Sequence, residues 1–281
     1  MSLPLDVTLL VLMAALMHAA WNAIAKSGAN KLLDITAMAV AGGAACALAL
    51  PFLPVPEPAA WPWLAASLLL HFLYFMALVG AYDAADLSHA YPLMRGVAPL
   101  FVALFGVVLL DDHLTTAMWA GVALISTGIL LPFWLRAGTQ KNLLKSSSFA
   151  LANAVVIAAY TLVDGLGTRL SANALSYCLW LFLLDPLPIL AVALARHGGG
   201  VWRHLQRRWF VCALGGVLTV GAYGIVLWAM TRAPIAAVAA LRETSVIFAA
   251  VIGSVFLHEG FGKARIAGAV LVVCGIAALR L

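Results

Sequence analysis

Polar and ionisable side chains stand inside apolar stretches of this chain that are long enough to cross a membrane. An ionisable group at the centre of a bilayer costs about 2.5–3.5 kcal/mol on insertion scales, so each one is a candidate for function. Two of them, Arg95 and Arg242, carry a guanidinium whose planar fork suits a carboxylate. The chemistry that these residues predict is recognition of a small molecule that bears a carboxylate.

The remaining candidates would complete a site for an amino acid. His18, Trp21 and Asn22 are spaced so that they share one helix face. Asn22, Glu243 or Asp164 could receive the ammonium group, and aromatic rings could hold the side chain or contact the ammonium group. The predicted substrate-binding residues are His18, Trp21, Asn22, His71, Tyr74, Tyr91, Arg95, Tyr160, Asp164, Tyr223, Trp228, Arg242, Glu243 and Thr244.

Several of these residues also have a purely structural interpretation. Arg242 and Glu243 are adjacent and could each be tied to other buried partners, and a buried histidine usually has a local hydrogen-bond partner. We interpret Asp112 as a cap of the helix that follows it, where the helix dipole favours a carboxylate. Asp185 precedes Pro186 inside an apolar stretch and is either a proton-sensing group or part of a kink.

The composition of the chain indicates an integral membrane protein. Of its 281 residues, 65% are hydrophobic and only 10% are charged, against about 25% charged residues in soluble domains. The net charge of +5 does not indicate a nucleic-acid partner, because the basic residues lie mainly in loops, where they set membrane orientation. Neither a metal-ligand spacing of Cys and His nor a catalytic motif occurs, so we predict no metal, no cofactor and no enzyme activity.

Proline, glycine and charged residues divide the chain into apolar segments of the length, about 20 residues, that a spanning helix needs. The predicted fold is therefore an all-α integral membrane protein with ten transmembrane helices. The expected spans are 5–26, 32–53, 61–82, 88–110, 115–135, 147–168, 173–195, 209–231, 233–257 and 263–280.

The chain contains an internal repeat, because residues 88–132 recur in diverged form at 235–279. A repeat unit of five helices is odd, so the two halves must enter the membrane in opposite directions. Such inverted repeats are typical of secondary transporters, with the substrate site near the midplane. We predict two five-helix units, 1–135 and 147–281. The matched pairs include Arg95 with Arg242, Gly121 with Gly268, and Gly128 with Gly275.

The distribution of polar residues predicts which helices line the site and how the chain is oriented. The first, third, fourth, sixth, eighth and ninth helices carry the candidates and should line a central cavity. The second, fifth and tenth helices should be scaffold or subunit contact, with Gly121 and Gly128 allowing close helix approach. Most basic residues lie in loops on one side, which by the positive-inside rule places both termini outside the cytoplasm.

The repeated stretch resembles a known family. Its first copy reads Pro99, then Asp112, then Trp119-x-Gly121 with Gly128 seven positions on, and its first helix contains HAAWNAIAK. This is similar to the EamA-type, ten-helix branch of the drug/metabolite transporter superfamily. The second copy departs from the family pattern with Val246 in place of proline, and Asp112 stands where the family usually has Glu.

The resemblance implies a carrier of small metabolites, often an exporter of amino acids, and YddG-type exporters of aromatic and neutral amino acids are the nearest functional comparison. It also implies cytoplasmic termini, in contrast to the charge distribution. We predict a multi-pass secondary transporter of the cell inner (plasma) membrane that exports amino acids by alternating access. The alternatives are a drug or sugar/nucleotide-sugar carrier of the same fold, an intramembrane lipid-modifying enzyme, and a channel. The expected partners are the small-molecule substrate and the lipid bilayer, without nucleic acid, and the chain should be a monomer or homodimer.

Overall fold

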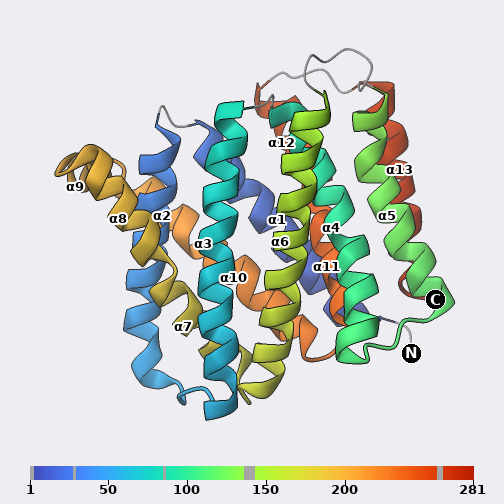
Figure 1. The fold of residues 1–281 in the computed structure, drawn as a ribbon, viewed down its shortest axis with the longest axis horizontal. Helices are drawn as coiled ribbons and strands as arrows, with labels where there is room; N and C mark the ends of the chain where they lie inside the picture. The colour runs from blue at the N-terminus through green and yellow to red at the C-terminus, as the bar shows by residue number, and fades with distance from the viewer. Residues whose placement is uncertain (1–2, 28–29, 85–86, 136–142, 258–261) are drawn as a thin grey trace.

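The computed structural model describes residues 3–27, 30–84, 87–135, 143–257 and 262–281, and within them every regular element is a helix (Figure 1). The predicted all-α fold is confirmed. The elements are α1 (Leu5–Ser27), α2 (Lys31–Ala49), η1 (Leu50–Phe52), η2 (Pro58–Ala60), α3 (Trp61–Ala84), α4 (Leu87–Leu110), α5 (Thr116–Trp134), α6 (Leu143–Leu170), α7 (Ala174–Leu184), α8 (Pro186–His197), α9 (Gly200–Arg207), α10 (Trp209–Met230), α11 (Ile235–Glu243), α12 (Ser245–Leu257) and α13 (Lys263–Ala278).

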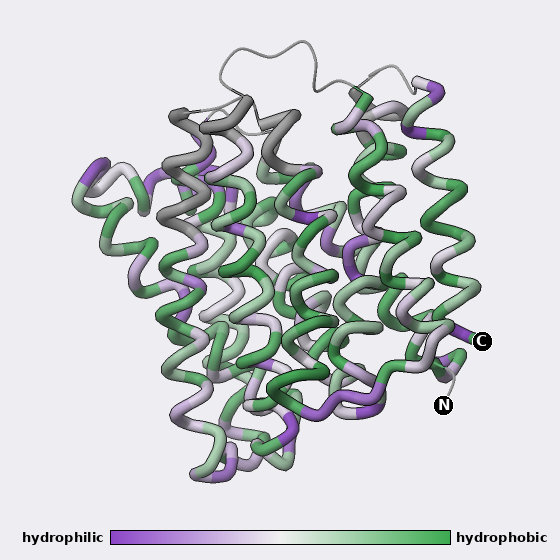
Figure 2. The backbone as a smooth tube through the Cα atoms, turned by 45° about the vertical axis from the view of Figure 1, so that its right-hand side comes forward, coloured by the Kyte–Doolittle hydropathy of each residue, from purple (hydrophilic) through white to green (hydrophobic). Residues whose placement is uncertain are grey.

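The helices form one membrane-spanning bundle. Among the described residues, eight helical segments are long and apolar enough to cross a membrane, and α3 and α13 run beside them, packed on α6 and α5 respectively. The bundle is thus compatible with the ten predicted spans. Hydrophobic residues cover the middle of the helices and polar residues gather near their ends (Figure 2).

Two of the membrane-spanning helices are broken. The sequence analysis considered a kink at Asp185 but did not predict the break at Thr244. The first break separates α7 from α8 at Asp185, because Pro186 has no N–H with which to continue the helical ladder. The second separates α11 from α12 at Thr244, whose hydroxyl donates a hydrogen bond to the carbonyl oxygen of Leu241 at 2.7 Å. Asp185 and Thr244 keep helical backbone angles, so each break interrupts the helical hydrogen bonds of its span without turning the chain aside.

Helix packing shows the inverted repeat directly. Exchanging the halves takes α1 to α6, α3 to α10, α4 to the α11–α12 pair, and α5 to α13. The contact of α3 with α6 then becomes that of α10 with α1, and the contact of α4 with α6 becomes that of α11 and α12 with α1. Each half crosses the membrane an odd number of times, so the two termini meet at one end, where the N–H of Leu3 donates to the carbonyl oxygen of Leu279 at 3.2 Å (Figure 1). The limits 1–135 and 147–281 stay a prediction, since residues 136–142 lie outside the described chain.

The contact between α5 and α13 obeys the same exchange in detail. A Cβ atom at Gly128 would lie 2.5 Å from the carbonyl oxygen of Gly268, and one at Gly275 would lie 2.8 Å from that of Gly121. Exchanging the halves turns the first of these contacts into the second. The prediction that these glycines serve close helix approach is confirmed, and neither α5 nor α13 has room for a side chain there.

Candidate functional site

A cavity of about 130 Å³ lies near the middle of the bundle. One water molecule needs roughly 10–15 Å³ by this kind of measure, so the cavity has room for a small organic molecule. Its walls come from α1, α3, α4, α6, α10 and α11, the helices that were predicted to line it, and also from α2 and α7. The prediction that the second helix is only scaffold is therefore wrong, because Ile35, Met38 and Gly42 of α2 form part of the wall.

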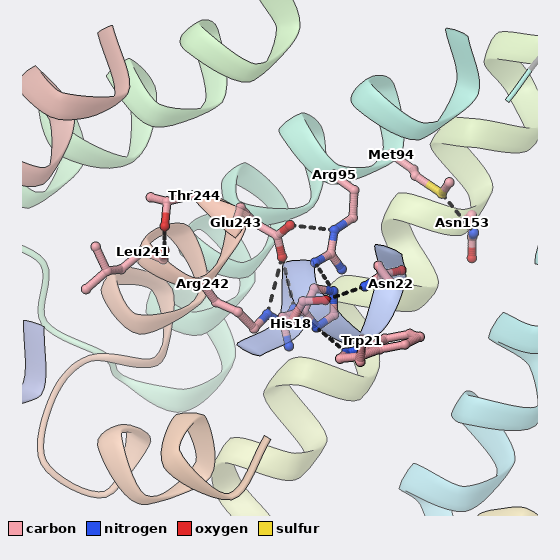
Figure 3. A network of polar contacts seen from close by, with 10 residues as sticks. All are labelled: His18, Trp21, Asn22, Met94, Arg95, Asn153, Leu241, Arg242, Glu243 and Thr244. Carbon is pink, nitrogen blue, oxygen red and sulfur yellow. Dashed lines mark hydrogen bonds and ion pairs between the residues drawn. The ribbon is translucent and has the colours of Figure 1, made fainter. Parts of the chain in front are cut away.

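Three charged side chains meet at one end of this cavity (Figure 3). Arg95 of α4 and Arg242 of α11, which the repeat relates, both pair with Glu243. The Arg95 Nε atom lies 2.6 Å from Glu243 Oε2, and Arg242 Nη2 lies 3.1 Å from Glu243 Oε1. All three residues are buried. Two guanidiniums thus share one carboxylate, and this cluster carries one net positive charge inside the membrane.

His18 of α1 completes this end of the cavity as a neutral imidazole. Its Nε2 atom lies 3.1 Å from Arg95 Nη2, and its Nδ1 atom lies 3.3 Å from the indole Nε1 of Trp21 (Figure 3). Arginine and tryptophan can only donate hydrogen bonds, and an imidazole offers an acceptor only on its unprotonated nitrogen. The shorter contact assigns the acceptor to Nε2, so His18 neutralises none of the charge of Arg95.

Arg242 has one edge of its guanidinium that is not used in its contact with Glu243. Its Nε and Nη2 atoms bond Glu243, while its Nη1 atom makes no hydrogen bond with another described residue. The residue lines the cavity, and its guanidinium carbon lies 6.0 Å from the ring centre of Tyr160. A remaining N–H fork beside an aromatic face is suited to a carboxylate.

Aromatic rings from three helices form the next part of the wall. The ring of His71 lies 4.5 Å from that of Tyr160 and 6.1 Å from that of Tyr223, and Tyr74 contacts Tyr160 at 5.9 Å between ring centres. His71 is held from its own helix, with its Nδ1 atom 3.1 Å from the hydroxyl of Ser67. Such rings offer apolar faces and edges to a ligand side chain.

Asp185, which the sequence analysis left undecided, belongs to the site. It lines the same cavity at the break between α7 and α8, and its carboxylate makes no hydrogen bond or ion pair with another described residue. An acid without a partner at membrane depth is costly unless it meets water or a ligand. The signal in the sequence was the acid before a proline in mid-span, which exposes the end of a half-helix.

Most of the predicted residues either line the cavity or stand directly behind its wall, and Trp228 and Tyr91 are counted in neither group. Trp228 was wrongly placed, because it lies at the far end of α10 with Arg232 stacked 5.0 Å from its ring centre, and its nearness to the helix end was the missed signal. The side chain of Tyr91 lies outside the described residues. The residues that line the cavity are His18, Trp21, His71, Tyr74, Arg95, Tyr160, Tyr223 and Arg242.

The other predicted residues stand behind this wall and serve its geometry. Asn22 donates to the carbonyl oxygen of His18 at 2.8 Å, and Thr244 donates to that of Leu241. Glu243 pairs with the arginines, and Asp164 accepts hydrogen bonds from two tyrosines. Helical spacing identifies a shared face, but it does not tell which members of that face reach the cavity.

Asp112 caps a helix, but not the one predicted. Its Oδ2 atom accepts a hydrogen bond from the N–H of Ile235 at 2.7 Å, at the start of α11 in the other half. Its Oδ1 atom pairs with Arg169 at 3.0 Å, while the helix after Asp112 is capped by Thr115. Asp112 thus ties the two halves together at the end of the bundle that carries the termini.

Among the described residues, no group of three or more His, Cys, Asp or Glu side chains is placed to hold a metal ion. The charged groups at the cavity are Arg95 and Arg242, which share the carboxylate of Glu243, and the separate carboxylate of Asp185.

Comparison with known proteins gives two findings. The model of the EamA-like transporter family matches residues 7–134 and again residues 144–281. A protein of known crystal structure superposes with a TM-score of 0.76 over 98% of both chains, at 21% sequence identity. The first finding covers the chain twice, once for each half, and the second shows a shared fold.

Proposed function

Since this chain belongs to the EamA-like transporter family and is a multi-pass membrane transporter, we propose that it exports amino acids, with aromatic or neutral side chains, by alternating access through the central cavity. The observation that carries this proposal is the placement of opposite charges in one cavity. The Arg95–Arg242–Glu243 cluster has one net positive charge, and Asp185 adds a separate negative charge. A zwitterion carries both signs.

The two charged regions suit the two ends of an α-amino acid. The carboxylate of the substrate would take the Nη1 edge of Arg242, which no described residue occupies. Its ammonium group would take Asp185, the residue that joins α7 to α8 in the cavity wall. Both contacts satisfy a charge that is otherwise expensive at this depth.

The rest of the wall supports an apolar or aromatic side chain. Tyr160, Tyr223 and Phe182 present rings, and Ile35 and Val220 present alkyl groups. A sugar would need several hydrogen-bond partners, and a cationic drug would be repelled by the arginine cluster. The amino-acid proposal therefore accounts for both the charged and the apolar parts of the wall.

Export is proposed from where the cavity lies. Its wall reaches Ile35, near the start of α2, and this end of α2 also holds α9 through Asp34, whose Oδ1 atom lies 2.9 Å from Nε2 of His204. The opposite end is packed, with Asp112 and Arg169 joining the halves there. Basic residues gather near the α9 end, and the positive-inside rule favours the cytoplasm for such an end. We therefore propose that the protein lies in the inner membrane, that the cavity loads from the cytoplasm and that the termini lie outside.

Counterflow in liposomes tests this function. Purified protein is reconstituted into vesicles loaded with one unlabelled solute, and uptake of labelled L-phenylalanine, L-leucine, a hexose or a cationic dye is followed. We expect saturable counterflow with the amino acids and none with the sugar or the dye. Saturation separates a carrier from a channel. Counterflow with the dye alone would contradict the proposal, as would chemical conversion of any solute.

A further inference from the structure

Asp164 is a buried carboxylate that the binding site does not use. It lies on α6 with 0% of its surface exposed. Its Oδ1 atom accepts a hydrogen bond from the hydroxyl of Tyr177 at 3.0 Å, and its Oδ2 atom accepts one from the hydroxyl of Tyr223 at 2.5 Å. Within the described chain, no lysine, arginine or histidine forms an ion pair with it. A charge buried without a counterion is among the most expensive features a protein can hold.

The helices packed around α6 contribute few groups that could balance this charge. α7 brings Tyr177 and Cys178, and α10 brings Tyr223; α3 brings His71, which faces Tyr160. α4 and α11 bring the charged cluster of Arg95, Arg242 and Glu243, and the break after α7 brings Asp185.

Counting charges around the cavity leaves one negative charge in excess. Two arginines face three acids, because Glu243, Asp185 and Asp164 all lie at this depth. Glu243 is compensated by both arginines, and Asp185 reaches the cavity, where water or an ammonium group can compensate it. Asp164 alone is sealed off without a cation, so binding a proton there restores neutrality.

Tyr223 connects this acid to the cavity. Its ring lines the cavity wall beside His71 and Phe182, while its hydroxyl donates to Asp164. A proton that arrives from cavity water can bind the Tyr223 oxygen as that oxygen passes its own proton to Asp164 Oδ2, and the reverse sequence returns it. Tyr177 donates to the same carboxylate but does not line the cavity.

We propose that Asp164 is the proton-binding site of this transporter, reached through Tyr223, and that it carries one proton inward for each substrate exported. An ionised carboxylate accepts hydrogen bonds from both phenols, whereas a protonated one must donate one of its own. The hydroxyl hydrogen of one phenol then has to rotate away from the acid, and if it is that of Tyr223 this hydrogen becomes available to another acceptor at the cavity wall. Proton binding and substrate binding are thereby linked. The inference rests on the proposed transport function and names its coupling ion.

Infrared difference spectroscopy tests the proton site without any substrate. A pH step applied to the purified wild-type protein should produce the C=O stretch of a buried carboxylic acid, and Asp164→Asn should lose this band. The same band in Asp164→Asn, or its absence from the wild type across the pH range in which the protein is folded, would overturn the proposal. Neither result bears on whether the protein transports amino acids.

A matched pair of tyrosine variants separates coupling from structural support. Tyr177→Phe and Tyr223→Phe each remove one hydrogen bond from Asp164, so a purely structural role predicts equal effects. We expect accumulation of labelled L-phenylalanine driven by an imposed pH gradient to persist in Tyr177→Phe and to be lost in Tyr223→Phe and Asp164→Asn, with counterflow retained in Asp164→Asn. Equal behaviour of the two tyrosine variants would contradict the relay. Wild-type counterflow that ignores the pH gradient would remove proton coupling and leave the transport function standing, whereas no counterflow at all would remove the transport function. The infrared result decides the proton site in either case.

Discussion

The two halves of this molecule share one design and differ in chemistry. In the first half α2 and α4 are continuous, although α4 contains two prolines. Their counterparts in the second half are broken, α7 from α8 at Asp185 and α11 from α12 at Thr244. The acids around the cavity, Asp164, Asp185 and Glu243, all belong to the second half as well.

The clearest difference lies beside the repeated arginines. Glu243 follows Arg242, whereas Gly96 follows Arg95 in the first copy, and a Cβ atom at Gly96 would lie 2.7 Å from the side chain of Leu130. The first half thus has no room for an acid at this position. A symmetric fold supplies two arginines, and the second half supplies the single carboxylate that leaves them with one net positive charge. Under the proposed function, this asymmetry is what lets the cavity receive the carboxylate of the substrate.

Removing that carboxylate should have the largest effect. Glu243→Gln leaves two buried guanidiniums with no shared acid, and breaking a buried ion pair in this way costs ~3–5 kcal/mol. We expect a large loss of stability, measured as the free energy of unfolding in mixed detergent micelles. The exposed Glu57→Gln should behave as wild type, and adding Arg95→Met to Glu243→Gln should recover part of the loss. If Glu243→Gln were as stable as wild type, Glu243 would not be compensating the charge of the two buried arginines.

The arginines should then differ in function although the repeat relates them. Arg95 is engaged by both Glu243 and His18, whereas Arg242 keeps Nη1 for a ligand. A hydrogen bond to a charged group is worth ~1.5–3 kcal/mol, so Arg242→Ala should raise the KM for amino-acid counterflow roughly 10- to 100-fold while the fold is retained. Arg232→Ala, on the exposed end of α10, is the control and should leave KM unchanged. An equal KM in Arg242→Ala would remove Arg242 from the site.

The sequence predicted the shared design better than the differences. Apolar length, the repeat and the close helix approach at Gly121 and Gly128 follow from local rules, and the structure confirms them. The carboxylate between the arginines was not predicted, because adjacent residues on a helix point about 100° apart and only the tertiary contact brings Glu243 between Arg95 and Arg242. Asp112 shows the same limit, since it caps α11 of the other half and no local pattern encodes that contact.

Where the halves do not differ, matched variants should have matched effects. Gly128→Ala places a methyl group against the carbonyl oxygen of Gly268, and Gly275→Ala, at the position that the repeat relates to Gly128, does the same against that of Gly121. Overpacking of this kind costs ~1–3 kcal/mol, so both variants should lower the unfolding free energy by similar amounts. Gly224→Ala, whose added methyl would meet only Cys178 at an ordinary 3.5 Å, serves as the control. A large difference between Gly128→Ala and Gly275→Ala would mean that the α5–α13 contact is not symmetric.

The break in α7–α8 gives the finest test, because it asks what the second half adds to recognition beyond the arginine cluster. Asp185→Asn keeps the size of the side chain and removes the charge that we assign to the ammonium group. We expect the KM for L-phenylalanine to rise about tenfold, which corresponds to about 1.4 kcal/mol. Competition by 3-phenylpropionate, which has the carboxylate and ring but no ammonium group, should be the same in Asp185→Asn and wild type. If Asp185→Asn weakens the binding of both ligands, Asp185 maintains the shape of the cavity and does not bind the ammonium group. Glu243 would then be the only acid by which the second half differs from the first in substrate recognition.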